Sequence, residues 1–241
     1  MTEINLPIPQ QKILESFVEK LKQAYGKNFL SAILYGSAAS GEFAEKYSNI
    51  NLLVVLTSTS LTELSKASGL ANSKRFRSIS PIFFTEEYIN SSTDVFPIEF
   101  LDMKENYRVL HGKDVLKGLT VDTRNLRFQC EQELKSRQIS IKRQYLVTQS
   151  RGELEKLLFK SFTSTVHIMR NLLRLKGKDA PYQKYLLLDE VEKEFSVNMT
   201  VFDEILWAKS KNMRLSYKDI DSLLIGLSTE LEALIRIVDK L

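Results

Sequence analysis

The segment from Ser31 to Leu56, SAILYGSAASGEFAEKYSNINLLVVL, constrains the fold of this chain most strongly. It begins with a short apolar run that ends at Gly36 and Ser37. It closes with a second run, NLLVVL, rich in the β-branched and aliphatic residues of buried strands. Gly36 lets the backbone leave the first strand sharply, and the small residues after it can begin a short helix with free amide groups. We therefore expect strand, tight turn, short helix and strand, with a turn suited to an anion.

Two asparagines stand at the start of the second predicted strand. Asn49 and Asn51 point to the same side of an extended strand, because side chains alternate there with a period of two. We expect a functional site at this polar pair, because it follows a Gly-Ser turn. The same pair also fits a plain loop-to-strand transition in which both amides bond to backbone groups.

At these residues the sequence resembles the signature of the polymerase-β-like nucleotidyltransferase superfamily, a Gly-Ser turn followed by Asp-x-Asp on a strand. The Gly-Ser is present at Gly36 and Ser37, whereas Asn49-Ile50-Asn51 stands in place of Asp-x-Asp. The resemblance is to bacterial minimal or aminoglycoside-type members, which carry a C-terminal helical domain. It implies Mg²⁺ and ATP or another nucleoside triphosphate as cofactors of active members, and a third carboxylate on a later strand.

Glu99 is the candidate for that third carboxylate. The run from Val95 to Met103, VFPIEFLDM, alternates large apolar residues with others and predicts a fourth strand, with Glu99 opposite to the aromatic side chains. Asp102 is the weaker candidate, because in such a strand its side chain would point to the face opposite to that of Glu99. The alternative is that Glu99 is an exposed glutamate with no role in a site.

The two asparagines change the chemistry that the site can perform. Nucleotidyl transfer needs carboxylates that hold Mg²⁺ against the triphosphate. Asparagine offers a neutral carbonyl oxygen and cannot act as a general base. In addition, Ser40 stands where many bacterial relatives carry arginine. We predict no metal site, whereas Gly36 and Ser37 keep the backbone amides and the hydroxyl that can bind a nucleotide phosphate.

The rest of the chain predicts two domains of an α+β protein. With 241 residues it can bury one large core or two smaller ones. Strand patterns stop near Asp122, and only long helical patterns follow. We expect a nucleotidyltransferase-like mixed sheet with flanking helices in residues 1–118, followed by an all-α helical bundle in residues 119–241.

Individual elements are also predicted from periodicity. The first domain should contain an amphipathic helix over residues 9–25, a helix over 60–70, and a strand over 79–84 that lies at a sheet edge because of Pro81. The second domain should contain core helices over residues 154–175 and 219–241.

Composition excludes several classes of protein. The single cysteine, Cys130, excludes an internal disulfide, and two histidines leave little for a zinc site. The sequence shows no signal-peptide pattern and no apolar run of transmembrane length. We therefore expect a cytoplasmic protein with no membrane partner.

We interpret the chain as a nucleotidyltransferase-fold protein with impaired transfer activity that binds a nucleotide or a protein partner. The alternative is an active Mg²⁺-dependent enzyme that transfers a nucleoside monophosphate to a hydroxyl of a small molecule or protein, with Glu99 and Glu42 or Glu45 as carboxylates. A third alternative is an RNA-binding module that uses the basic run from Lys135 to Arg151. Such runs on helices are usually solvated faces, so nucleic acid is not an expected partner. No motif marks an acceptor substrate.

Overall fold

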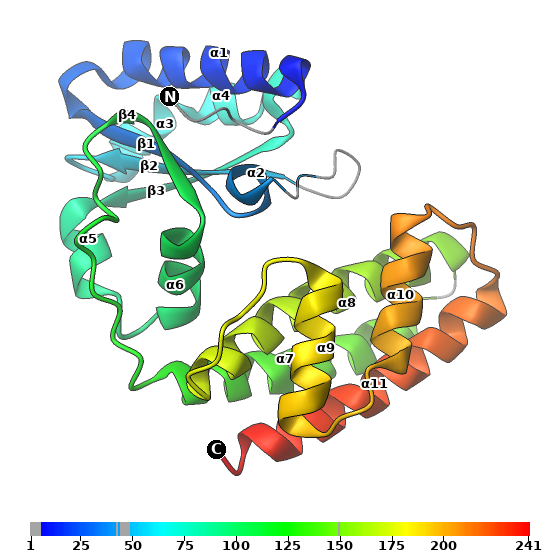
Figure 1. The fold of residues 1–241 in the computed structure, drawn as a ribbon. Helices are drawn as coiled ribbons and strands as arrows, with labels where there is room; N and C mark the ends of the chain where they lie inside the picture. The colour runs from blue at the N-terminus through cyan, green and yellow to red at the C-terminus, as the bar shows by residue number, and fades with distance from the viewer. Residues whose placement is uncertain (1–5, 42, 44–48, 149) are drawn as a thin grey trace. The chain divides into compact units, whose positions relative to one another are not determined.

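The computed structural model describes residues 6–41, 43, 49–148 and 150–241 (Figure 1). The chain divides into two compact units, Met1–Asp122 and Thr123–Leu241. The first unit contains a mixed sheet with helices, and the second contains helices alone. This arrangement confirms the predicted α+β class with a helical C-terminal region.

The sheet of the first unit has four strands in the order β3-β2-β1-β4. β1 is antiparallel to both β2 and β4, whereas β2 and β3 are parallel. The central β2 is fully buried from Leu52 to Leu56, which explains why this part is apolar throughout, since a strand covered on both faces has no solvent side to make polar. The strands are β1 (Phe29–Tyr35), β2 (Ile50–Leu56), β3 (Ile79–Thr85) and β4 (Tyr107–Gly112).

Helices cover both faces of this sheet. Figure 1 shows α1 (Ile8–Tyr25) on one face and α5 (Glu86–Ser91) with α6 (Pro97–Glu105) on the other. Leu52 and Val54 of β2 belong to the core under α1, and Leu53 and Val55 belong to the core under α5 and α6. Short helices complete the unit: η1 (Gly26–Asn28), α2 (Ser37–Ser40), α3 (Leu61–Ser65), α4 (Ser68–Ala71) and η2 (Lys74–Phe76).

Two predictions in this unit are confirmed and one is confirmed in part. The predicted helix over 9–25 is α1, and the predicted edge strand over 79–84 is β3 at the sheet edge. The predicted helix over 60–70 is two short helices, α3 and α4. The chain tightens between them, because the amides of Lys66 and Ala67 bond to carbonyls three residues back.

The predicted strand from Val95 to Met103 is wrong, because this segment forms helix α6. Pro97 occupies the first turn, where its missing N–H costs nothing, and Glu99 lies in the same turn, where a negative charge is favourable. Phe100 and Met103, three residues apart, are both buried against the sheet. In a run this short, the same apolar positions fit both the two-residue period of a strand and the longer period of a helix. The fourth strand is β4, which follows α6.

Gly112, at the end of β4, can be tested as a fold-determining residue. Its φ is 78°, and a Cβ there would overlap the carbonyl oxygen of Leu30. We expect Gly112→Ala to lower the unfolding free energy by about 2 kcal/mol or more, because it adds left-handed strain and a backbone clash. The measurement is urea unfolding followed by far-ultraviolet circular dichroism. Gly118→Ala is the matched control, since nothing lies within 4 Å of a Cβ at Gly118; an equal loss in both variants would contradict the prediction.

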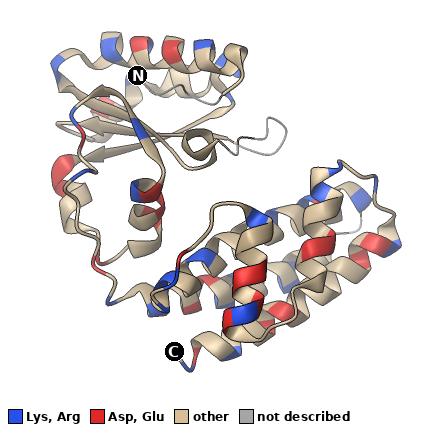
Figure 2. Cartoon of the chain, viewed as in Figure 1, with Lys and Arg blue, Asp and Glu red and all other residues tan. Residues whose placement is uncertain are grey.

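The second unit is a helical bundle. α7, α8 and α11 pack on one another; the shorter α9 packs against α8 and α10, and α10 also packs against α8 and α11. The predicted core helices over 154–175 and 219–241 are confirmed as α8 and α11. Acidic and basic residues are both scattered over the helices (Figure 2). In the described part of the chain, no helix is both long enough and apolar enough to cross a bilayer. The helices are α7 (Leu126–Val147), α8 (Arg151–Leu175), α9 (Lys184–Phe195), α10 (Thr200–Ser210) and α11 (Tyr217–Val238).

Candidate functional site

The Gly-Ser turn lies between β1 and α2. Gly36 has φ 72° and ψ −147°, and its N–H donates to the carbonyl of Asn106 at 3.1 Å. The Gly36 carbonyl accepts hydrogen bonds from Ala39 and Ser40 at 2.9 and 3.0 Å. The first amides of α2, beginning with Ser37, therefore have no acceptor inside the helix. This is the predicted strand, turn and short helix; anion binding at the turn stays a prediction.

A row of polar side chains crosses the sheet beside this turn. Asn51 in β2 pairs with Tyr35 in β1 and with Ser80 in β3, and Tyr35 also pairs with Tyr107 in β4. Directly paired residues place their side chains on the same face of a sheet. These four residues, here called the polar row, lie on the face that α6 covers.

The structure places both predicted asparagines at this end of β2. Asn49 is exposed just before the strand, and Asn51 is half-buried inside it. Tyr35, the partner of Asn51, directly precedes Gly36, so Asn51 lies at the strand end where the turn begins. The Asn51 amide is uncharged and can both donate and accept hydrogen bonds.

Glu99 comes to the polar row from a helix instead of a strand. It is exposed on α6. Burial, together with the negative charges of Asp102 and Glu99, raises the pKa of the Tyr35 phenol to about 12. Glu99 and Asp102 of α6 therefore both act electrostatically on the residue that pairs with Asn51.

The two asparagines at this end of β2 bear on whether the site could hold Mg²⁺. Mg²⁺ prefers charged oxygen ligands in octahedral geometry, and Asn49 and Asn51 supply only neutral ones. Among the described residues, no three His, Cys, Asp or Glu side chains are grouped in a way that could hold a metal ion. Glu42 and Glu45, candidates for the active alternative, lie outside the described residues.

Three members of the polar row were not anticipated from the sequence. Tyr35 directly precedes the glycine of the turn, which could have drawn attention to it. Ser80 and Tyr107 carry no local signal, and only strand pairing brings them to Asn51. The Tyr107 hydroxyl donates to Asp114 Oδ2 at 3.1 Å, which orients the ring at the outer strand.

Comparison of the sequence with protein-family profiles and with curated proteins finds no match. Among solved structures, the chain is similar to spectinomycin adenyltransferase AAD(9) from Enterococcus faecialis, whose crystal structure was determined with ATP and spectinomycin. The TM-score is 0.60 at 11% sequence identity, over 92% of this chain and 99% of that chain. The fold is nucleotidyltransferase-like. This likeness covers both units and concerns the fold alone.

The Tyr35 phenol gives this nucleotidyltransferase-like fold a testable pH dependence. An unfolded tyrosine loses its proton near pH 10.0, whereas Tyr35 in the folded protein keeps it to about pH 12. Unfolding is therefore favoured as pH rises above 10.0, at a cost of up to ~1.4 kcal/mol per pH unit. We expect wild type to lose stability relative to Tyr35→Phe across this range, measured by urea unfolding. Tyr88→Phe, at an exposed tyrosine of the same unit, should lose stability with rising pH as wild type does. If Tyr35→Phe lost as much stability as wild type, the pH dependence could not come from the Tyr35 phenol.

The pKa of Lys209 in the helical unit is strongly lowered. Lys209 on α10 donates to Thr163 Oγ1 at 2.7 Å and lies 5.9 Å from the ring centroid of Phe162. Burial, together with the positive charge of Lys184, lowers the pKa of Lys209 to about 8. An anion beside this ammonium group would stabilise its charged form.

Two lysines of the basic run from Lys135 to Arg151 are paired with carboxylates. Lys135 forms ion pairs with Glu131 at 2.5 Å and with Asp239 at 3.0 Å, and Lys142 pairs with Glu232 at 3.1 Å. Nucleic-acid binding needs a concentration of uncompensated cations. These two lysines therefore add little uncompensated charge for the RNA-binding alternative, which stays a prediction.

Proposed function

We propose that this chain is a nucleotidyltransferase-fold protein that binds a nucleotide but is impaired in metal-dependent nucleotidyl transfer. The observation that carries the proposal is Asn51, which stands in the polar row next to the Gly36 turn. At that position the superfamily resemblance implies a carboxylate. A neutral amide there can bond to a nucleotide, yet it cannot supply the charge that holds Mg²⁺.

The proposed nucleotide contacts come from groups that need no metal. The first amides of α2 and the Ser37 hydroxyl can bond to phosphate oxygens, because such contacts depend on backbone direction instead of side-chain charge. ATP is the nucleotide we propose to test, since the structural neighbour AAD(9) was solved with ATP. We propose no acceptor substrate.

The second candidate function is an active nucleotidyltransferase. The observation in its favour is that Glu99 and Asp102 both act on Tyr35, so negative charge is not missing from the neighbourhood of the polar row. Two carboxylates from α6 would then have to take over the role of the missing Asp-x-Asp pair.

Isothermal titration calorimetry with ATP, with and without Mg²⁺, separates the two candidates. We expect wild type to bind ATP with the same affinity in both conditions and to transfer no nucleotide in the presence of Mg²⁺. Ser37→Glu should abolish binding, because its carboxylate repels the phosphates at the start of α2. Ser68→Glu is the matched control, since Ser68 is the first residue of α4. Mg²⁺-dependent turnover by wild type would establish the active alternative, and ATP binding unaffected by Ser37→Glu would refute the proposed site.

A further inference from the structure

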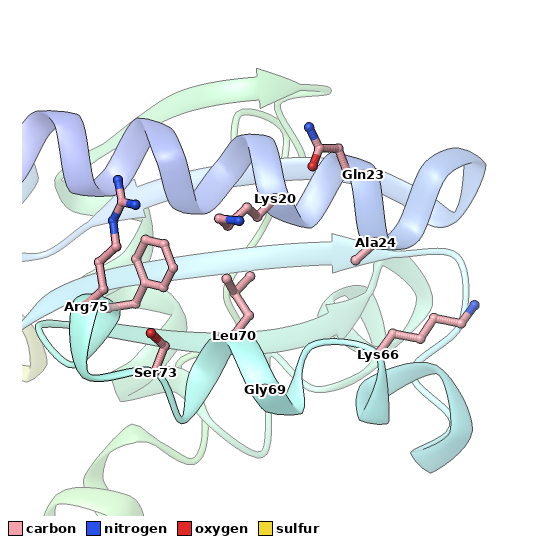
Figure 3. A pocket seen from close by; sticks show the side chains of 9 residues that line it. Lys20, Gln23, Ala24, Lys66, Gly69, Leu70, Ser73 and Arg75 are labelled. Atoms are coloured by element: carbon pink, nitrogen blue, oxygen red, sulfur yellow. The ribbon is translucent and has the colours of Figure 1, made fainter.

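A hollow of about 650 Å³ lies on the sheet face opposite to the polar row. Its walls come from α1, from α4 with the preceding turn, and from η2 (Figure 3). The core beneath it is the one under α1, which contains Ala67 and Phe76. The hollow is therefore separate from the candidate nucleotide site within the same unit.

Among the residues that the structure describes, three cations and no carboxylate line this hollow. Lys20 comes from α1, Lys66 from the end of α3, and Arg75 from η2. Lys66 is partly neutralised by Glu63 at 2.8 Å, while Lys20 and Arg75 form no ion pair with any residue that the structure describes. The guanidinium of Arg75 lies 5.4 Å from the ring centroid of Phe76, which keeps it over the apolar wall. The hollow therefore carries uncompensated positive charge, which attracts an anionic partner.

The cations are spread along the hollow around an apolar centre. Figure 3 shows Lys66 and Arg75 at opposite ends, with Lys20 and Leu70 between them. A single phosphate cannot contact cations at both ends. An extended ligand with several negative charges and an apolar group between them matches this arrangement, since the charges meet the rim and the apolar group meets Leu70.

We propose that this hollow binds an acidic segment of a partner protein, with an apolar side chain on Leu70 and carboxylates at Lys20 and Arg75. A single-stranded nucleic acid fits less well, because base stacking needs an exposed aromatic face and Phe76 is only 3% exposed. The proposal does not depend on nucleotide binding at the polar row, because the two sites lie on opposite faces of the sheet.

Gly69 offers a clean way to change the charge of the hollow. It lines the hollow, and nothing lies within 4 Å of a Cβ built there. Gly69→Glu therefore adds a carboxylate without a clash at Cβ. Gly69→Ala is the matched control, since it makes the same backbone change without the charge. Lys20→Glu, at an exposed position of α1, provides a second charge reversal on another element.

The probe is a phage-displayed library of short random peptides, selected on the purified full chain, with affinities of the selected peptides measured by fluorescence anisotropy. We expect acidic peptides with an apolar residue, and binding that weakens with salt. Their affinity should fall by at least about tenfold in Gly69→Glu and in Lys20→Glu but not in Gly69→Ala.

Four results would overturn the proposal: no enrichment of any peptide, enrichment of peptides without acidic residues, equal affinity for Gly69→Glu and wild type, or displacement of the peptides by a single-stranded RNA oligonucleotide that binds more tightly. Circular dichroism of each variant verifies that it is folded. ATP binding measured on Gly69→Glu should be unchanged, so a failure of this proposal is distinguishable from a failure of the nucleotide site.

Discussion

Replacing Asn49 and Asn51 together by aspartate is expected to make nucleotide binding dependent on Mg²⁺. The double variant places two carboxylates at the end of β2, next to the Gly36 turn, where two neutral amides now stand. Charged oxygens are the ligands that Mg²⁺ needs near a triphosphate. In calorimetry we expect ATP to bind the double variant at least about tenfold more tightly with Mg²⁺ than without it, a difference of about 1.4 kcal/mol.

The same variant should respond to the metal ion alone. Its new carboxylates lie on the sheet face near Glu99 and Asp102, so their repulsion should lower thermal stability in the absence of Mg²⁺. Adding Mg²⁺ should raise the melting temperature of the double variant and leave that of wild type unchanged, because a ligand stabilises the state that binds it.

The matched control for this experiment is Asn72→Asp with Asn90→Asp, which adds the same charge at two exposed positions of the same unit. It should show neither Mg²⁺-dependent ATP binding nor stabilisation by Mg²⁺. Tight Mg²⁺-ATP binding with turnover by wild type would refute the impaired site. If the double aspartate variant shows no response to Mg²⁺, the assignment of these two positions as the lost metal ligands is wrong.

Truncation of Phe162 to alanine is expected to have the largest effect on stability in the helical unit. Phe162 is fully buried on α8, and its ring centroid lies 6.1 Å from that of Phe202 on α10. Phe→Ala at a buried site removes transfer free energy and leaves a cavity, which costs about 3–5 kcal/mol. Trp207 on α10 is the single tryptophan of the chain, so its fluorescence reports urea unfolding of this unit.

Phe128→Ala is the control for Phe162→Ala. Phe128 lies on α7 in the same unit, but 62% of it is exposed. The identical chemical change there should alter the unfolding free energy by about 0.5 kcal/mol or less. Because the chain has two units, the tryptophan signal is analysed separately from circular dichroism, which reports both. A similar shift in the two variants would show that α8 is not the core helix of this unit.

Local sequence was sufficient for the parts of the fold in which one period repeats over a long run or one strand is wholly apolar. α8 and α11 have long apolar stripes, and β2 is apolar without a break from Leu52 to Leu56, so their burial could be inferred residue by residue. The Gly36 turn was also predictable, because a positive φ at a strand end strongly favours glycine.

The segment from Val95 to Met103 shows where local inference fails. Its alternation is real, but Pro97 and the acidic first turn are helix-start signals that compete with it. Tertiary packing decides between the two, since Phe100 and Met103 both meet the sheet only if the segment is helical. The consequence for function is direct, because Glu99 then approaches the polar row from a covering helix.

By itself, the sequence determined that a strand and a Gly-Ser turn are followed by a second strand with Asn49 and Asn51 at its start. It also determined that neither residue carries the charge a metal ion needs. Only the tertiary structure decided which residues surround them. Ser80 and Tyr107 reach the row through strand pairing, and the charges of Glu99 and Asp102 reach Tyr35 through the packing of α6. The physical reason is that register and helix packing depend on segments far apart in the chain, so no local pattern encodes them.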